Sequence, residues 1–168
     1  TEEGTVRVGG QDVRTLALAD LRSRVGVVTQ EVELFRAPLR DNLTVFGAVT
    51  ATDDQLRQAL DDVGLGPWFT SLPNGLDELL HGDADLSAGE SQLLAFARLL
   101  LTDPGLIVLD EASSRLDPGT EARLTAATEH LLAGRTAVVI AHRLDTLARA
   151  DHIAGLDHGR LVEHGPRA

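Results

Sequence analysis

The chain has 168 residues, and its 15 basic residues, all of them arginine, stand against 26 acidic ones and give a net charge of −11. This length fits one domain with a hydrophobic core, and the acidic balance argues against a nucleic-acid-binding surface, which needs a basic patch. The absence of Cys excludes disulfides and thiolate chemistry, and the absence of Lys excludes a GxxxxGKS/T phosphate loop within these residues. The sequence contains no run of 18 apolar residues, so no membrane span is predicted.

The first predicted elements are β-structure. Residues 5–8 form a short β-type run that ends at Gly9-Gly10, a pair typical of tight hairpin turns. Residues 25–29, with the sequence VGVVT, are nearly all apolar and predict a buried strand.

Two helices are predicted from capping boxes, in which Ser or Thr is followed three residues later by Glu or Gln. The first runs over residues 52–63 from a Thr-x-x-Gln start, and Gly64 ends it. The second begins with Ser-x-x-Glu and covers residues 87–102, with Pro104-Gly105 behind it. Both helices carry apolar residues at helical spacing, so each is expected to pack one face on the core.

The last third alternates strands and helices. Residues 106–109 and 136–141 are apolar and predict two further buried strands. Between them, Asp-Pro at the start of residues 117–132 predicts a helix with an N-cap and a first-turn proline. A short helix is expected over residues 143–150, and a hairpin with its turn at Asp157-His158-Gly159 follows.

Apolar strands separated by helices indicate a parallel sheet covered on both faces. The predicted fold class is therefore α/β, with an antiparallel appendage at each end. The chain reads as one domain.

The segment LIVLDE at residues 106–111 places two carboxylates, Asp110 and Glu111, at the carboxyl end of a strand. Ligands of open α/β sheets bind at that edge. The first acid suits Mg²⁺, and the second suits a general base that activates water for attack on a phosphoryl group. The alternative is a strand followed by an acidic loop without function.

Other candidates lie near strand and helix ends. Ser87 starts a helix, and its hydroxyl and the nearby backbone N–H groups can form an anion site. A plain capping box explains the serine at this position equally well. Gln30 and His142 end two strands, and each has a structural alternative, as a surface residue and as a satisfied core histidine respectively. Asp117 has a simple role as an N-cap.

Together these segments resemble the nucleotide-binding domain of an ATP-binding cassette (ABC) transporter. Their order and spacing match that family: Gln30 in Val-Thr-Gln, LSAGE at residues 86–90, Asp110-Glu111, SSRLD at residues 113–117, and His142 in Ile-Ala-His-Arg. Residues 21–42 further resemble the exporter-type subfamily. The resemblance covers essentially the whole chain. It implies a P-loop NTPase-like parallel sheet, with a helical subdomain at about residues 31–103 and an ATPase core at 1–30 and 104–168.

The resemblance implies ATP and Mg²⁺ as cofactors and gives roles to the candidates. Asp110 corresponds to the Walker B acid that holds Mg²⁺, and Glu111 to the catalytic glutamate. Gln30 corresponds to the Q-loop residue that contacts Mg²⁺ and the attacking water. His142 corresponds to the switch histidine at the γ-phosphate.

The LSAGE segment resembles the LSGGQ signature, which contacts ATP held by an opposing subunit. That role is implied for Ser87, Ala88, Gly89 and Glu90, and Asp117 is implied to connect the two ATP sites. Ala88 and Glu90 depart from the family's pattern. A methyl group and a carboxylate at a phosphate-facing helix start predict a weaker site, and hence a heterodimer with two unequal sites.

The implied partners are a second nucleotide-binding domain, as a homo- or heterodimer, and the transmembrane domains of a transporter, with no nucleic acid. The implied location is the cytoplasmic face of the cell membrane. Because the family's P-loop lies before the first hairpin, we expect the chain to be the part after the P-loop, inactive as an ATPase alone. One alternative is a non-catalytic cassette that docks on a partner and supplies its signature in trans. Another is an ABC-class ATPase of DNA repair or translation.

Overall fold

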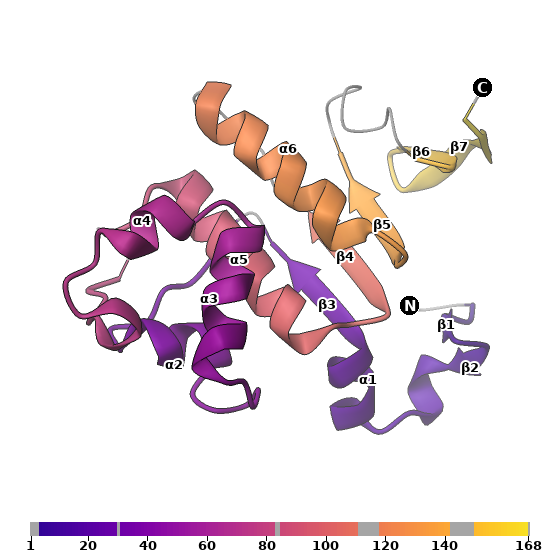
Figure 1. Cartoon of the computed structure of the whole chain (residues 1–168). Coiled ribbons are helices and arrows are strands. Elements are labelled where there is room, and N and C mark those ends of the chain that lie inside the picture. The colour runs from indigo at the N-terminus through magenta and orange to yellow at the C-terminus, as the bar shows by residue number, and fades with distance from the viewer. Residues whose placement is uncertain (1–3, 30, 83–84, 111–117, 142–149, 168) are drawn as a thin grey trace.

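A computed structural model of the chain describes residues 4–29, 31–82, 85–110, 118–141 and 150–167. Its strands form a central three-stranded sheet, in the order β3-β4-β5, and two separate two-stranded sheets, β1-β2 and β6-β7. Helices gather on one side of the central sheet, and the two small sheets lie away from them (Figure 1). The predicted α/β class with an antiparallel appendage at each end is confirmed.

Both appendages form tight hairpins. In the first, β1 (Arg7–Val8) pairs with β2 (Gln11–Asp12) around two glycines with φ of 57° and 79°. In the second, β6 (His152–Asp157) pairs with β7 (Arg160–Pro166), and the turn residues His158 and Gly159 have φ of 46° and 75°. Positive φ at both turn positions matches the twist of the flanking strands, which is why glycine is favoured there.

The central sheet is parallel throughout. It consists of β3 (Val25–Val28), β4 (Leu106–Asp110) and β5 (Thr136–Ile140), and Leu109 is in register with Val28 on one side and Val139 on the other. On one face Val28, Ile107 and Leu109 are at most 2% exposed. The three predicted strands and their parallel arrangement are therefore confirmed.

Coverage of the sheet on both faces was also predicted, and that prediction is wrong for the described residues. On the second face Val27 is 55% exposed and Val138 50%. Four of the five residues of β5 are exposed, so the expected burial of residues 136–141 is wrong too. An apolar run favours burial but does not say what fills each side, and β5 pairs only with β4 in the described part of the chain.

The helices predicted at residues 52–63, 87–102 and 117–132 are confirmed, and the structure adds shorter helices that were not predicted. After the first hairpin come a 3-10 turn, η1 (Val13–Thr15), and α1 (Leu18–Arg24). The helical region contains α2 (Leu39–Thr44), α3 (Asp53–Asp62), α4 (Gly66–Thr70), η2 (Gly75–Asp77) and α5 (Ala88–Thr102), and α6 (Pro118–Leu132) follows β4. The expected helix over residues 143–150 lies almost wholly outside the described residues. No described helix is long and apolar enough to cross a bilayer.

The capping box predicted for α3 is complete. The Gln55 N–H donates to Thr52 Oγ1 at 3.3 Å, and the Thr52 N–H donates to Gln55 Oε1 at 2.8 Å. Gly64 has φ of 77° just after the helix, which explains why it ends there. Sequence alone was sufficient here because a cap involves only near neighbours.

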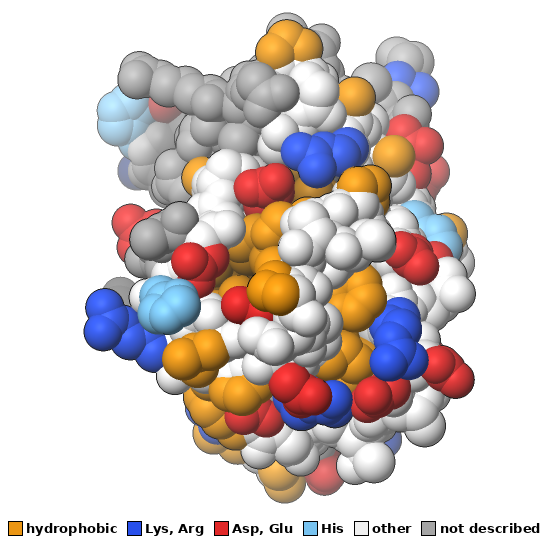
Figure 2. Space-filling view, turned by 60° about the vertical axis from the view of Figure 1, so that its left-hand side comes forward, with side chains coloured by type: hydrophobic (Ala, Val, Ile, Leu, Met, Phe, Trp, Pro, Cys, Tyr) orange, Lys and Arg blue, Asp and Glu red, His pale blue; other side chains and the backbone are white. Residues whose placement is uncertain are grey.

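The core is centred on α5, whose Leu93, Leu94, Phe96 and Ala97 are completely buried. Against β3, α5 comes so close that a Cβ added at Gly26 would lie 2.5 Å from Leu99 Cδ2. Glycine at this position thus permits the helix to pack on the sheet. The helical side of the surface intersperses acidic and arginine side chains around apolar ones (Figure 2).

Candidate functional site

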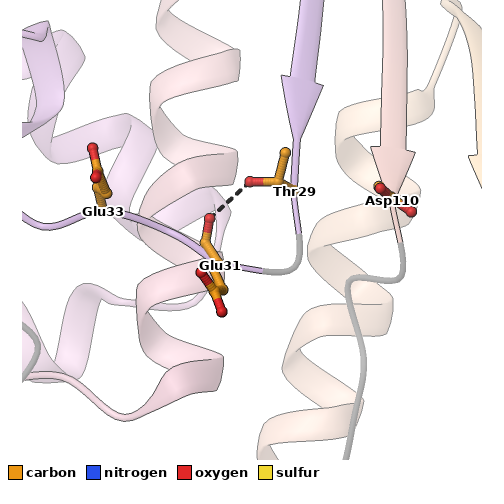
Figure 3. A pocket seen from close by; sticks show the side chains of 4 residues that line it. All are labelled: Thr29, Glu31, Glu33 and Asp110. Carbon is orange, nitrogen blue, oxygen red and sulfur yellow. Dashed lines mark hydrogen bonds between the residues drawn. The ribbon is translucent and has the colours of Figure 1, made fainter.

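An acidic cavity of about 550 Å³ lies at the carboxyl ends of β3 and β4, lined by Thr29, Glu31, Glu33 and Asp110. Figure 3 shows Asp110 at the end of its strand and the two glutamates on the segment that leaves β3. The Thr29 hydroxyl donates to the Glu31 carbonyl at 2.7 Å and fixes the start of that segment. The cavity therefore occupies the edge where α/β sheets bind ligands.

Asp110 is the last residue of β4 and is exposed to solvent. Its carboxylate fits Mg²⁺, which proteins commonly hold through one or two carboxylates while water and substrate phosphates fill the other positions. The side chains of Glu31 and Glu33 point away from each other (Figure 3), and the described residues contain no cluster of three potential metal ligands. Within the described part of the chain, Asp110 therefore offers a single carboxylate at this edge of the sheet.

The start of α5 carries the second part of the site. Ser87 is its N-cap: the Glu90 N–H donates to Ser87 Oγ at 3.3 Å, and the Ser87 N–H donates to Glu90 Oε2 at 2.9 Å. The capping box predicted from the sequence is confirmed. In addition, the Ser87 hydroxyl lies 2.8 Å from Glu90 Oε2 and donates to it.

This arrangement has a chemical consequence. Ser87 and Ala88 are exposed, as an anion-binding helix start requires, whereas Gly89 is buried and Glu90 half-buried. The Glu90 carboxylate already occupies the positive end of the helix and accepts the hydrogen bond that the Ser87 hydroxyl donates. An incoming phosphate would have to compete with that carboxylate for the same donors.

The two parts of the site share one segment. A groove of about 680 Å³ lies between residues 31–35 and the first turn of α5, and Leu86, Ala88 and Ser91 line it. Glu31 and Glu33 line both this groove and the cavity at Asp110. Residues 31–35 therefore run from the end of β3 alongside the start of the helix that Ser87 caps.

The described residues include five of the predicted site residues: Ser87, Ala88, Gly89, Glu90 and Asp110. The other four, Gln30, Glu111, Asp117 and His142, lie outside them. Asp110, which precedes Glu111, is paired across β4 and β5 with Ile140, which lies two residues before His142, at the edge where β3 also ends. The roles of all nine residues stay predictions.

Sequence reasoning missed a polar pair beneath the groove, Asn42 and Arg98. Asn42 is completely buried, and burial lowers the pKa of Arg98 below its usual value. One signal was available: Arg98 interrupts the apolar run of residues 93–101. A charged residue in a buried helix face requires partners that local sequence does not reveal.

Comparison with known proteins gives consistent matches. Residues 1–114 match the family model described as ABC transporter. The chain is 42% identical to an uncharacterized ABC transporter ATP-binding protein of Bacillus subtilis (strain 168), over 96% of this chain and 27% of that protein. It is 45% identical to a multidrug efflux ATP-binding/permease protein of Mycobacterium tuberculosis (strain ATCC 25618 / H37Rv), over 96% of this chain and 14% of that protein.

A solved structure of a bacterial Atm1-family ABC exporter with ATP bound matches with a TM-score of 0.85 and 33% identity, covering 98% of this chain and 29% of that one. The chain thus spans less than a third of the length of these relatives. The parallel sheet and the helices beside it are the fold that they share with this chain.

Proposed function

The chain belongs to the ABC transporter family, and from that premise we propose that it serves as the ATP-binding and hydrolysing cassette of an exporter. Exporter type is supported by the likeness to the Atm1-family structure and to the multidrug efflux protein. One observation carries the proposal. The cavity at Asp110, a strand end suited to Mg²⁺, and the groove at the start of α5, a helix start suited to phosphate, share Glu31 and Glu33 in their linings.

We assign the chemistry at the sheet edge as follows. Asp110 would hold Mg²⁺, which would offset the charge on the phosphates when bound. Glu111 would accept a proton from the attacking water, Gln30 would orient that water, and His142 would donate a hydrogen bond to the γ-phosphate. Support comes from the register, which ends β3, β4 and β5 at one edge.

In the proposed assembly, the exposed start of α5 does not contact the ATP that is hydrolysed at Asp110 of the same chain. Ser87, Ala88, Gly89 and Glu90 would contact ATP held by a second nucleotide-binding domain, and Asp117 would connect the two sites. Residues 31–103 would form the helical subdomain, beside a core of residues 1–30 and 104–168. Closure of the pair would drive transmembrane domains, placing the cassette at the cytoplasmic face of the membrane.

A second candidate function rests on composition. The sequence has no lysine, so these residues do not supply the lysine that a Walker A loop directs at the β- and γ-phosphates. The chain would then act as a non-catalytic cassette that offers its α5 start to a partner's ATP. In that case, hydrolysis would depend on the partner's acids and not on Asp110.

Substitution of Asp110 separates the two candidates. In the intact transporter, Asp110→Asn should raise the Mg²⁺ concentration needed for half-maximal ATP hydrolysis and lower the maximal rate. The matched control is Glu33→Gln. Glu33 lines the same cavity, but its carboxylate points away from Asp110 (Figure 3). Equal Mg²⁺ dependence in Asp110→Asn and the parent protein would reject the catalytic proposal and favour the non-catalytic one.

A further inference from the structure

Two histidines lie together on the hairpin of β6 and β7, which is set apart from the helices beside the central sheet (Figure 1). His152 is the first residue of β6, and His164 lies near the end of β7. The two imidazole rings are stacked, with their centroids 6.0 Å apart and their planes at 19° to each other. The folding of the hairpin, and not a short spacing in sequence, therefore brings the two rings together.

The register of the hairpin places both histidines on its exposed face. His164 is paired with Ala154, and His152 lies two positions before Ala154 on the same strand. Because side chains alternate between the two faces of a strand, these three residues share a face, and all three are exposed. Ile153 and Gly165, on the opposite face, are half-buried. A ligand from solvent can thus reach the two imidazoles.

The nitrogen atoms of this pair differ from those of the other described histidines in having no partner. Each of those others has an aspartate oxygen close to a ring nitrogen, at 3.5 Å for His81, 3.7 Å for His130 and 2.7 Å for His158. Within the described part of the chain, His152 and His164 have neither a hydrogen bond nor an ion pair. Neutral imidazole binds metal ions through either ring nitrogen, so both rings are free to do so.

The spacing of the two rings fits one shared metal ion. Two metal–nitrogen bonds of about 2.0–2.1 Å place the nitrogens up to about 4 Å apart, and the rings themselves cover the rest of the 6.0 Å between the centroids. The χ2 torsion of histidine has broad minima, and both side chains are exposed. Rotation of the rings can therefore direct one nitrogen of each at a common point while the strands stay in place.

We propose that His152 and His164 form a binding site for a divalent transition-metal ion of the class that imidazole favours, with Cu²⁺ bound most tightly and Ni²⁺ and Zn²⁺ less so. No third His, Asp or Glu joins the pair among the described residues, so water oxygens complete the coordination. The metal joins β6 to β7 at the open end of the hairpin. This site is separate from the two cavities of the proposed function, which have other linings.

Cu²⁺ titration of the intact transporter tests the pair, with excess Mg²⁺ present to occupy carboxylate sites, which suit that harder ion. We expect one Cu²⁺ per chain whose affinity falls by at least about 10-fold in His152→Gln and in His164→Gln. Loss of an outer-shell partner already costs about 10- to 100-fold in metal affinity, and loss of a direct ligand costs no less. Ni²⁺ and Zn²⁺ should compete for the same site with lower affinity than Cu²⁺.

Two further variants serve as controls. His158→Gln removes an exposed histidine of the same hairpin whose Nδ1 lies 2.7 Å from Asp157, and it should leave the Cu²⁺ affinity unchanged. His164→Phe keeps an aromatic ring that can stack on His152 but removes the ligand. If the pair binds metal, this variant should lose Cu²⁺ as His164→Gln does, while amide exchange of the metal-free hairpin stays at the parent rate.

The outcomes decide the proposal independently of ATP hydrolysis. Parent-like Cu²⁺ affinity in either glutamine variant overturns the site, because both histidines are required. An equal loss in His158→Gln overturns it too, since the copper would then bind exposed histidines without selection. If His164→Gln fails to fold, His152→Gln decides. Failure of the proposed function is recognised separately, by hydrolysis that survives Asp110→Asn, and it leaves this site unaffected.

Discussion

The Glu90 carboxylate has two opposing effects: it caps α5, and it places a negative charge at a proposed phosphate site. The substitution Glu90→Gln separates these effects. In the structure its Oε2 accepts from both the backbone N–H and the hydroxyl of Ser87. Glutamine keeps one acceptor for the N–H, as Gln55 does in the capping box of α3. The substitution thus removes the charge while preserving the cap geometry, because both hydrogen bonds from Ser87 go to one oxygen and the amide oxygen of glutamine can take its place.

The expected magnitudes follow from the charge alone. A carboxylate in the first turn of a helix contributes about 0.3–1 kcal/mol through the helix dipole, so the free energy of unfolding should fall by about that amount. The same field becomes available to a bound phosphate. ATP affinity of the assembled pair should therefore rise by about 2- to 5-fold, since 1.4 kcal/mol corresponds to about tenfold in binding.

Affinity is best measured where turnover is blocked. With Glu111→Gln in the background, ATP binding to the intact transporter can be titrated at equilibrium, and Ala88→Gly can be added to test the extra methyl group. Gln55→Glu is the matched control, because it changes the charge of the other capping box, away from the site. A fall in melting temperature without any gain in ATP affinity would show that Glu90 is a cap only, and the predicted inequality of the two sites would fail.

The remaining predictions concern the assigned catalytic groups and the core. Glu111→Gln should lower ATP turnover by about 10²–10⁴-fold, the usual range for loss of a general base, while nucleotide binding persists; an unchanged steady-state rate would remove Glu111 from that role. His142→Ala should cost about 10²–10³-fold in kcat, as for removal of one preorganised donor, and normal hydrolysis would return His142 to a structural role. Phe96→Ala should destabilise the fold by about 3–5 kcal/mol, because the side chain is completely buried at the centre of the core. Denaturant unfolding measures that loss, and exposed Leu156→Ala, at 73% exposure, should stay close to the parent value.

Elements fixed by near neighbours were predicted well. Both capping boxes, the Gly9-Gly10 and His158-Gly159 turns and the three parallel strands follow from residues within a few positions of each other. Such signals act over short distances, so the same residues give the same local structure in many folds. The motif at residues 106–111 was informative for a related reason, since its apolar run correctly predicted β4 with Asp110 at its end.

Features that depend on distant packing were not predicted. The exposure of β5 depends on which elements cover each face of the sheet, and the apolar sequence of the strand does not indicate which elements these are. Asn42 and Arg98 meet across 56 residues, beyond the reach of any local pattern. The lining of the cavity by Glu31 and Glu33 likewise depends on how the chain leaves β3 and passes α5.

The distinction between local and distant signals matters for how the proposed site would work. Ser87 is placed by a cap within its own helix, whereas Asp110 is placed at the end of a strand that is paired on both sides. Hydrolysis at two ATP sites requires their relative positions to be set, which local devices do not do. In this chain residues 31–38 lead from the end of β3 to α2, and they are held by side-chain hydrogen bonds with Arg98 and Asn42 and by a backbone bridge between Pro38 and Leu79. The residues hardest to find from sequence are therefore the ones that hold this segment in place, because their partners lie far away along the chain.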